Sequence, residues 1–240
     1  MDVLGDAWGW LTTAENWTEG GGILQRLWEH AQYSALAVLL AALIALPIGL
    51  VIGHTGRGES GTFLVSGAAR AIPTLGLLVL LGSQYPLKAW PVIVVLVVLA
   101  IPPILANTTA GIGGIDPASR DAAKGMGMTP RQVLTKVEVP LAAPLILAGL
   151  RSATLQVIAT ATIAAYASLG GLGRFIVDGF AVSDEARIYG ASIVVAALAL
   201  LSEGAFVLAQ RAASPGRERE VTADIPTTVP VPNTAGGITS

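Results

Sequence analysis

Five long apolar stretches, separated by shorter polar ones, dominate the hydrophobic pattern of this chain. A helix needs about 20 apolar residues to cross the hydrocarbon core of a bilayer, and each stretch is close to that length. The pattern therefore predicts an all-α integral membrane fold with five transmembrane helices. The predicted spans are residues 33–52, 62–82, 91–110, 141–166 and 188–210.

The two ends of the chain lack this apolar pattern. Residues 1–30 are polar and acidic and contain several tryptophans. Because tryptophan prefers the boundary between membrane and water, we expect an interfacial, extracytoplasmic segment here, with a disordered tail as the alternative. Residues 212–240 are rich in Pro, Thr, Gly and charge, which predicts a disordered cytoplasmic tail. The membrane domain is then residues 31–211.

Composition supports this class. Hydrophobic residues make up 53% of the 240-residue chain and charged residues only 12%, with a mean hydropathy of +0.67, whereas soluble domains carry roughly a quarter charged residues. The net charge of −2 argues against a nucleic-acid partner. Cysteine is absent from the sequence, which excludes disulfides, thiol nucleophiles and Cys-ligated metals within the chain.

The polar stretch 116–140 is predicted to form two short helices joined by a glycine elbow. Asp116 followed by proline is typical of a helix N-cap, and Gly125 and Gly127 are expected to end that helix. Thr129, with proline next and Gln132 three residues later, predicts a capping box at the start of the second helix.

The first of these helices carries a ridge of small residues. Ala118, Ala122 and Met126 share one face at helical spacing, while Arg120 and Lys124 share another. Small side chains permit close approach and flanking cations can meet acidic groups, so the ridge fits the groove of another protein. A solvated loop that merely reconnects two spans explains the periodicity equally well.

The residues of this stretch resemble a known motif. Asp121-Ala122-Ala123, Gly127, and then Val137, Val139 and Pro140 are similar to the EAA loop of ABC importer permeases: Glu-Ala-Ala, three residues, Gly, nine residues, then Ile-x-Leu-Pro. Three residues depart conservatively from this motif: Asp121 replaces Glu, Val137 replaces Ile and Val139 replaces Leu. Asp121 has a shorter side chain than glutamate. The wider run AAKGMGMTPRQVLTKVEVPLAAPLILAGLRSAT resembles the glycine betaine/carnitine/choline branch, and the similarity extends over most of residues 70–200.

This resemblance implies a type I importer permease whose EAA loop is a coupling helix seated in a groove of a cytoplasmic ABC ATPase. It also implies an extracytoplasmic substrate-binding protein and a second permease subunit, in a homodimer or heterodimer. The residues it assigns to ATPase coupling are Asp121, Ala122, Ala123, Lys124, Gly125, Met126, Gly127 and Pro140.

Charged and proline residues inside the predicted spans are candidates for the translocation path or a gate. Charges are costly in a membrane and rarely face lipid, so Glu203 is expected to pair with Arg70 or Arg151 rather than to relay protons. Consecutive prolines predict a helix break, acting as a gate hinge or only as a kink. The candidates are Arg70, Pro73, Pro102, Pro103, Asn107, Arg151 and Glu203.

Three other features are given plain structural interpretations. His54 is expected to be a satisfied or solvated loop histidine, since no second metal ligand lies at helical spacing. The GGLG run at 170–173 has no preceding strand and no following Lys-Ser/Thr, so we interpret it as a flexible turn and not a phosphate loop. Acidic Asp178, Asp184 and Glu185 offer a contact for an external partner.

The distribution of basic residues predicts the orientation. Five spans place the termini on opposite sides, and an outside N-terminus puts eight basic residues inside against four outside, as the positive-inside rule favours. The inside set is Arg57, Arg120, Lys124, Arg131, Lys136, Arg211, Arg217 and Arg219, and the outside set is Arg26, Lys88, Arg174 and Arg187.

The spans predict a multi-pass protein of the cell membrane, and the resemblance implies a permease that imports an osmoprotectant such as glycine betaine, choline, carnitine or proline. No nucleotide-binding loop is present, so ATP is expected to be bound and hydrolysed by a partner chain, and no cofactor or metal is expected here. The alternatives are a permease for another small solute such as methionine, a membrane enzyme, or a structural membrane subunit.

Overall fold

The computed structural model describes most of the predicted membrane domain. The described residues are 3–58, 60–62, 64, 66–67, 74–85, 88–167 and 170–213. Arg70, Pro73 and nearly all of the predicted tail lie outside them. The first part of the predicted span 62–82 is only partly described, and its second part is helix α5, Thr74–Gln84.

Four helices in the described part are long and apolar enough to cross a membrane. They are α3 (Ile23–Thr55), α6 (Trp90–Gly113), α9 (Val139–Ala161) and α11 (Glu185–Ala213). The predicted spans at 33–52, 91–110 and 188–210 lie within α3, α6 and α11. The span predicted at 141–166 ends earlier as an α-helix and continues as a 3₁₀ turn, Thr162–Ala167.

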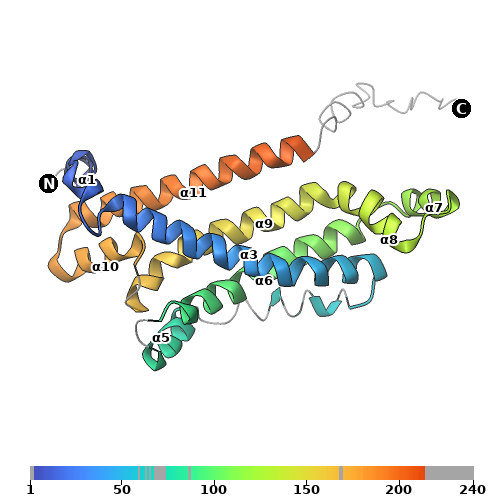
Figure 1. Ribbon diagram of the computed structural model, residues 1–240, viewed down its shortest axis with the longest axis horizontal. Coiled ribbons are helices and arrows are strands. Elements are labelled where there is room, and N and C mark those ends of the chain that lie inside the picture. The colour runs from blue at the N-terminus through green and yellow to red at the C-terminus, as the bar shows by residue number, and fades with distance from the viewer. Residues whose placement is uncertain are drawn as a thin grey trace, which may run out of the picture.

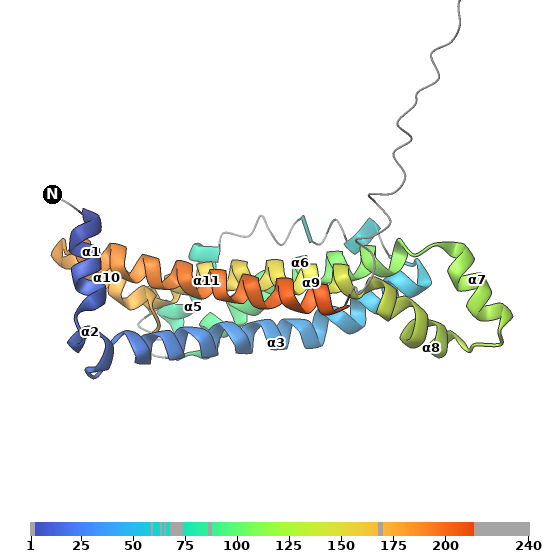
Figure 2. The same cartoon turned by 90° about the horizontal axis from the view of Figure 1, so that it is seen from above.

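The long helices form an elongated bundle with short helices at its two ends (Figures 1 and 2). Helix α6 packs against both α3 and α9, and α11 packs against α9. The end that we call the α7/α8 end carries α7 (Pro117–Gly125) and α8 (Pro130–Val133). The opposite α1/α10 end carries α1 (Val3–Thr12), α2 (Glu15–Thr18) and α10 (Gly173–Val182).

A stripe of small residues brings α3 close to α6. The buried stripe, one residue in every four, is Ala37, Ala41, Ala45, Gly49 and Gly53. A Cβ at Gly49 would lie 2.8 Å from the Cβ of Thr108, and one at Gly53 would lie 2.6 Å from the Cβ of Ile112. Small residues at this spacing let membrane helices approach closely, so the stripe decides which face of α3 is inside.

The predicted break at Pro102-Pro103 is wrong, because α6 runs through both prolines without interruption. Both rings are buried, and a Cβ at Gly149 of α9 would lie 2.9 Å from the carbonyl oxygen of Pro103. Asn107 Nδ2 donates to that oxygen at 2.8 Å. Tight packing accompanies a continuous helix although two backbone donors are missing.

The α1/α10 end contains more helix than the sequence predicted. The first residues form helices α1 and α2, and α3 begins at Ile23, so the predicted boundary at residue 30 falls inside a helix. The ten-residue helix α10 begins at Gly173, the last residue of the predicted turn. Gly171 N–H donates to Glu29 Oε2 of α3 at 2.8 Å, with φ at +87°. The glycines here let the chain pack closely against α3.

Candidate functional site

The predicted caps of the polar stretch are confirmed. The Asp116 carboxylate accepts from Ala118 N–H at 3.0 Å, and α7 ends at Gly125. Gly127 has φ +79°, a left-handed conformation that glycine adopts without penalty. Thr129 and Gln132 form the predicted capping box, with bonds of 2.8 and 3.4 Å. The elbow between α7 and α8 therefore has a defined shape.

The predicted ridge of α7 is exposed at the tip of the bundle (Figure 2). Ala118, Ala122 and Met126 are all exposed, and Met126 retains 71% of its accessible surface. Asp121 and Lys124 are also exposed and form an ion pair at 3.6 Å. An apolar methionine beside small residues and a weak surface ion pair is a surface that another protein can cover at little cost.

The remaining residues assigned to coupling lie elsewhere. Ala123 is buried on the inner face of α7, so it supports the helix rather than the exposed ridge. Pro140 lies in the first turn of α9 and has no N–H with which to close an α-helical turn. The turn just before it, Leu134–Glu138, is wound as a π-helix. Consequently the second predicted helix does not stand alone but continues from Pro130 to Ala161.

Arg120 was predicted to flank the ridge and to be available to an acidic partner, but the structure places it otherwise. It points back into the bundle, where Nη2 donates to the Ile112 carbonyl at 2.6 Å. Its Nε lies 2.7 Å from Glu138 Oε1, an ion pair whose N–H is not aligned for a hydrogen bond. Because both contacts are internal, Lys124 is the basic group on this face of α7 that stays available to a partner.

A buried carboxylate, Glu138, is the main feature of this end that sequence reasoning missed. Its side chain is only 1% exposed, and His54 Nδ1 lies 2.6 Å from Oε2. His54 is thus satisfied, one of the two states expected for it. The signal for Glu138 was its position inside the apolar run Val137-Glu138-Val139-Pro140, since a carboxylate in such a run needs partners from elsewhere.

A second set of charged residues lies between α9 and α11, where Glu203 pairs with Arg151. Arg151 Nε donates to Glu203 Oε2 at 2.6 Å, and Nη2 contacts the other carboxylate oxygen. Arg151 Nη1 also donates to Gln210 at 3.4 Å, and Gln210 donates to the Pro144 carbonyl at 3.2 Å. The predicted pairing of Glu203 with Arg151 is confirmed. Asn107 lies where α6 meets α9, tied to its own helix through Pro103.

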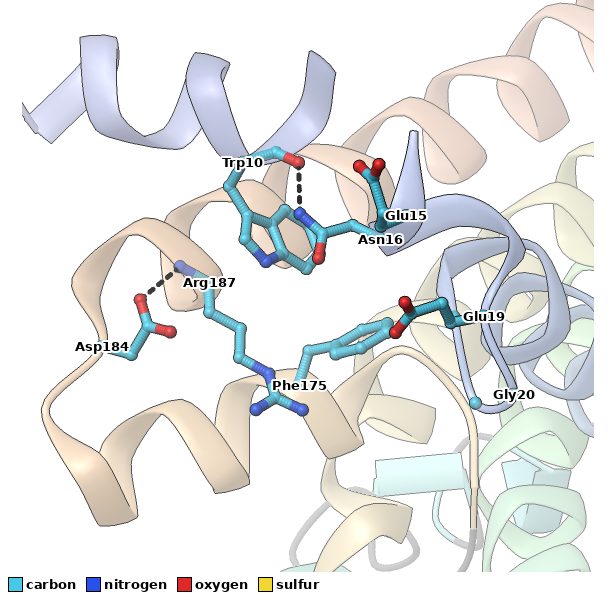
Figure 3. Close-up of a pocket in the computed structure, with 10 residues that line it drawn as sticks. Trp10, Glu15, Asn16, Glu19, Gly20, Phe175, Asp184 and Arg187 are labelled. Carbon is cyan, nitrogen blue, oxygen red and sulfur yellow. Dashed lines mark hydrogen bonds between the residues drawn. The ribbon is translucent and has the colours of Figure 1, made fainter. Parts of the chain in front are cut away.

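The α1/α10 end contains a polar hollow of about 390 Å³ (Figure 3). Trp10 meets Phe175 edge to face at 5.3 Å between ring centres, and the Arg187 guanidinium lies 5.1 Å from the Phe175 centre. Glu15 and Glu19 line the other side. Phe175 is only 6% exposed, so its ring offers little free surface.

Of the three acidic residues predicted to offer an external contact, Asp178 is paired with arginines of the same chain. Asp178 pairs with Arg174 at 3.0 Å and with Arg187 at 3.5 Å. Asp184 accepts from the Arg187 backbone N–H at 3.1 Å. The charge of Asp178 is therefore used within the fold, and Asp184 serves as a cap for the start of α11.

The bundle with its projecting helical elbow has the architecture of an importer permease. Residues 45–218 match the family described as the binding-protein-dependent transport system inner membrane component. The chain belongs to this family and is a non-catalytic permease subunit of an ABC importer, in which a separate chain hydrolyses ATP. The family implies an ATPase, a binding protein and a second permease subunit as partners, and a multi-pass membrane location.

Several relatives are similar over most of their length. The chain is 37% identical over 198 residues to the choline transport system permease protein OpuBB of Bacillus subtilis, covering 82% of this chain and 91% of that protein. It is 34% identical over 203 residues to the carnitine transport permease protein OpuCD of Listeria monocytogenes, covering 84% and 91%.

A solved structure confirms the fold. The inward-facing MetNI methionine ABC transporter matches with a TM-score of 0.69 at 20% identity, covering 80% of this chain and 96% of that chain. At this identity the likeness supports the architecture of an importer permease and carries no information on the solute.

Proposed function

We propose that this permease imports small quaternary-ammonium osmoprotectants, such as choline, carnitine or glycine betaine. The similarity to permeases named for choline and carnitine transport carries this proposal. Proline is a further candidate of the same osmoprotectant class. The alternative, methionine, rests on a fold likeness of 20% identity alone.

In this proposal the exposed ridge of α7 docks into the cytoplasmic ATPase, with Ala122, Lys124 and Met126 at its centre. ATP is bound only by that partner, and this chain needs no cofactor. Closure of two ATPase subunits would draw two such ridges together and rock the two bundles between inward and outward access. The glycine elbow and the capped helix ends support this role, because they keep the ridge at a set angle.

Recognition of the solute is assigned mainly to the separate binding protein. A quaternary ammonium is selected by free aromatic faces. In the described part of the chain, Trp10 and Phe175 do meet at the α1/α10 end, but Arg187 already covers Phe175. This pair is therefore not free to form an aromatic cage.

A second permease subunit is proposed to cover the face of α9 and α11 that carries Arg151 and Glu203. Their side chains are 35% and 25% exposed in the single chain. Charges within a span are costly if they face lipid, so this face is better placed against another subunit or a water-filled path. The same reasoning keeps both residues as candidates for the lining of the path.

We propose that the α7/α8 end is cytoplasmic and the N-terminus lies outside the cell membrane. By element, Arg120, Lys124, Arg131 and Lys136 lie in or next to α7 and α8, and Arg57 follows the end of α3 that pairs with Glu138. Arg26, Arg174 and Arg187 lie at the starts of α3, α10 and α11. The excess at the α7/α8 end supports this orientation under the positive-inside rule.

Single introduced cysteines test the orientation on a clean background, because the chain has no cysteine of its own. In vesicles from cells that lack the ATPase, we expect a membrane-impermeant maleimide to label Glu19→Cys in right-side-out vesicles and Lys124→Cys only in inverted vesicles. Both residues are exposed, so accessibility within the fold does not bias the comparison. Labelling of Lys124→Cys from the outside would refute the cytoplasmic docking surface.

Reconstitution tests the solute. The permease, its cognate ATPase and its binding protein are placed in liposomes, and uptake of labelled choline, carnitine, glycine betaine, proline and methionine is measured with and without ATP inside. We expect ATP-dependent uptake of at least one quaternary-ammonium solute and none of methionine. Uptake of methionine alone would establish the alternative.

A further inference from the structure

Four elements of the α7/α8 end meet at one buried carboxylate. Glu138, in the turn that leads into α9, pairs with His54 at the end of α3 and with Arg120 of α7. Arg120 also holds the Ile112 carbonyl near the end of α6. Three spans and the projecting helix are thus connected through the side chains of Glu138, Arg120 and His54, which we call the Glu138 joint.

This arrangement is more specific than packing requires. Glu138 is 1% exposed, and a charge is expensive to bury unless it is well paired. An apolar residue, like its neighbours Val137 and Val139, would fill the same space without that cost. Charged contacts differ from apolar ones in being directional, so they hold α3 and α7 at set positions against the start of α9.

The backbone around Glu138 is wound to make these contacts. The π-helical turn Leu134–Glu138 contains the residue and comes just before Pro140. A π-turn shifts the side chains that follow it around the helix axis relative to a regular α-helix. The position of the family's proline and the inward direction of Glu138 are therefore parts of one local structure.

The two sides of α7 have different partners. Asp121, Lys124 and Met126 face outward, where the proposed ATPase docks, whereas Arg120 and Ala123 face the bundle. A displacement applied to the outer side can reach the spans along the backbone at the two ends of α7 and through the side chains of its inner side. There, Arg120 pairs with Glu138 and donates to the Ile112 carbonyl, and Ala123 is buried.

From this geometry we propose that Glu138 is the positioning residue through which movement of α7 reaches α3 and α9. It touches neither solute nor nucleotide. The inference rests on the proposed docking of α7 and adds the internal link that turns docking into movement of the spans. Loss of the joint should leave ATP hydrolysis in place but separate it from transport.

The test uses the complete transporter in liposomes, with ATP hydrolysis and solute uptake measured in the same preparation. Glu138→Gln keeps the size of the side chain and removes its charge. We expect hydrolysis within twofold of the unsubstituted transporter, and uptake per ATP at least tenfold lower. Glu138→Asp keeps the charge but draws it back by one methylene. Its uptake per ATP should lie between that of the unsubstituted transporter and that of Glu138→Gln.

Glu29→Gln is the matched control. Glu29 is also a paired carboxylate, held by Arg26 at 3.0 Å and by the Gly171 N–H, but it lies at the opposite end of α3. Its loss should lower thermal stability without changing uptake per ATP. A general loss of stability would therefore affect both variants, whereas a loss of coupling would affect only Glu138→Gln.

Two outcomes overturn the inference: unchanged uptake per ATP in Glu138→Gln, or the same fall in the Glu29→Gln control. If Glu138→Gln is not recovered from the membrane, Arg120→Lys and His54→Ala replace it, and unchanged coupling in both also overturns it. Failure of the unsubstituted permease to retain its ATPase on purification would instead refute the proposed docking, which separates the two conclusions.

Discussion

Arg151→Leu is expected to destabilise the protein strongly, because it leaves the Glu203 carboxylate without its charged partner inside a span. Breaking such a pair on one side costs about 3 kcal/mol in the free energy of unfolding. For a chain of this size, that loss lowers the melting temperature of the detergent-solubilised protein by roughly 10 °C. Thermal unfolding followed by size-exclusion chromatography measures the shift.

The double variant Arg151→Leu/Glu203→Leu tests whether the unpaired charge causes this loss of stability. Replacing both members of an ion pair with apolar residues is often neutral or stabilising, so we expect the double variant to regain most of the lost melting temperature. It should also regain uptake if the pair is structural. A double variant as unstable as the single one would show that the contacts of Arg151 with Gln210, and not the pair, hold α9 to α11.

Gly53→Leu is expected to have the other large effect, since it forces apart the two helices at the centre of the bundle. Even a Cβ at this position would lie 2.6 Å from the Ile112 Cβ and 2.9 Å from the Thr109 carbonyl oxygen. Overpacking of a well-packed core costs typically about 1–3 kcal/mol, and the rigid atoms met here place the cost at the upper end. Melting temperature and the yield of monodisperse protein are the measurements.

Gly204→Leu is the matched control for that substitution. Gly204 also lies in a long apolar helix, yet nothing lies within 4 Å of a Cβ built there. The change removes a glycine from a helix and adds the same side chain, so it should be neutral or slightly stabilising. Equal destabilisation by both variants would mean that leucine itself, and not the approach of α3 to α6, is responsible.

Local features of the fold were predictable because they depend on neighbours in sequence. The caps at Asp116 and Thr129 act within two or three residues, so residue type and spacing were enough to predict them. The lengths of the apolar stretches likewise predicted α3, α6 and α11. The errors arose where a local rule was overruled by packing, as at Pro102 and Pro103, whose buried surroundings keep α6 continuous.

The candidate site was predictable in part for the same reason. The exposed ridge of Ala118, Ala122 and Met126 follows from helical periodicity. Periodicity also placed Arg120 on the outer surface, because it cannot tell which side of a short helix meets the rest of the protein. Only the packing of α7 on the bundle turned Arg120 inward to Glu138.

By itself, the sequence determined the membrane class, the approximate spans, the two capped ends of the elbow and, through its resemblance, the permease family. All of these depend on composition or on residues within a few positions of one another. The tertiary structure alone decided that Glu203 pairs with Arg151, 52 residues away, and that Glu138 binds His54, 84 residues away. Such pairs form only when particular helix faces meet, and the glycine and alanine stripe of α3 and the close contact at Gly149 decide which faces do so.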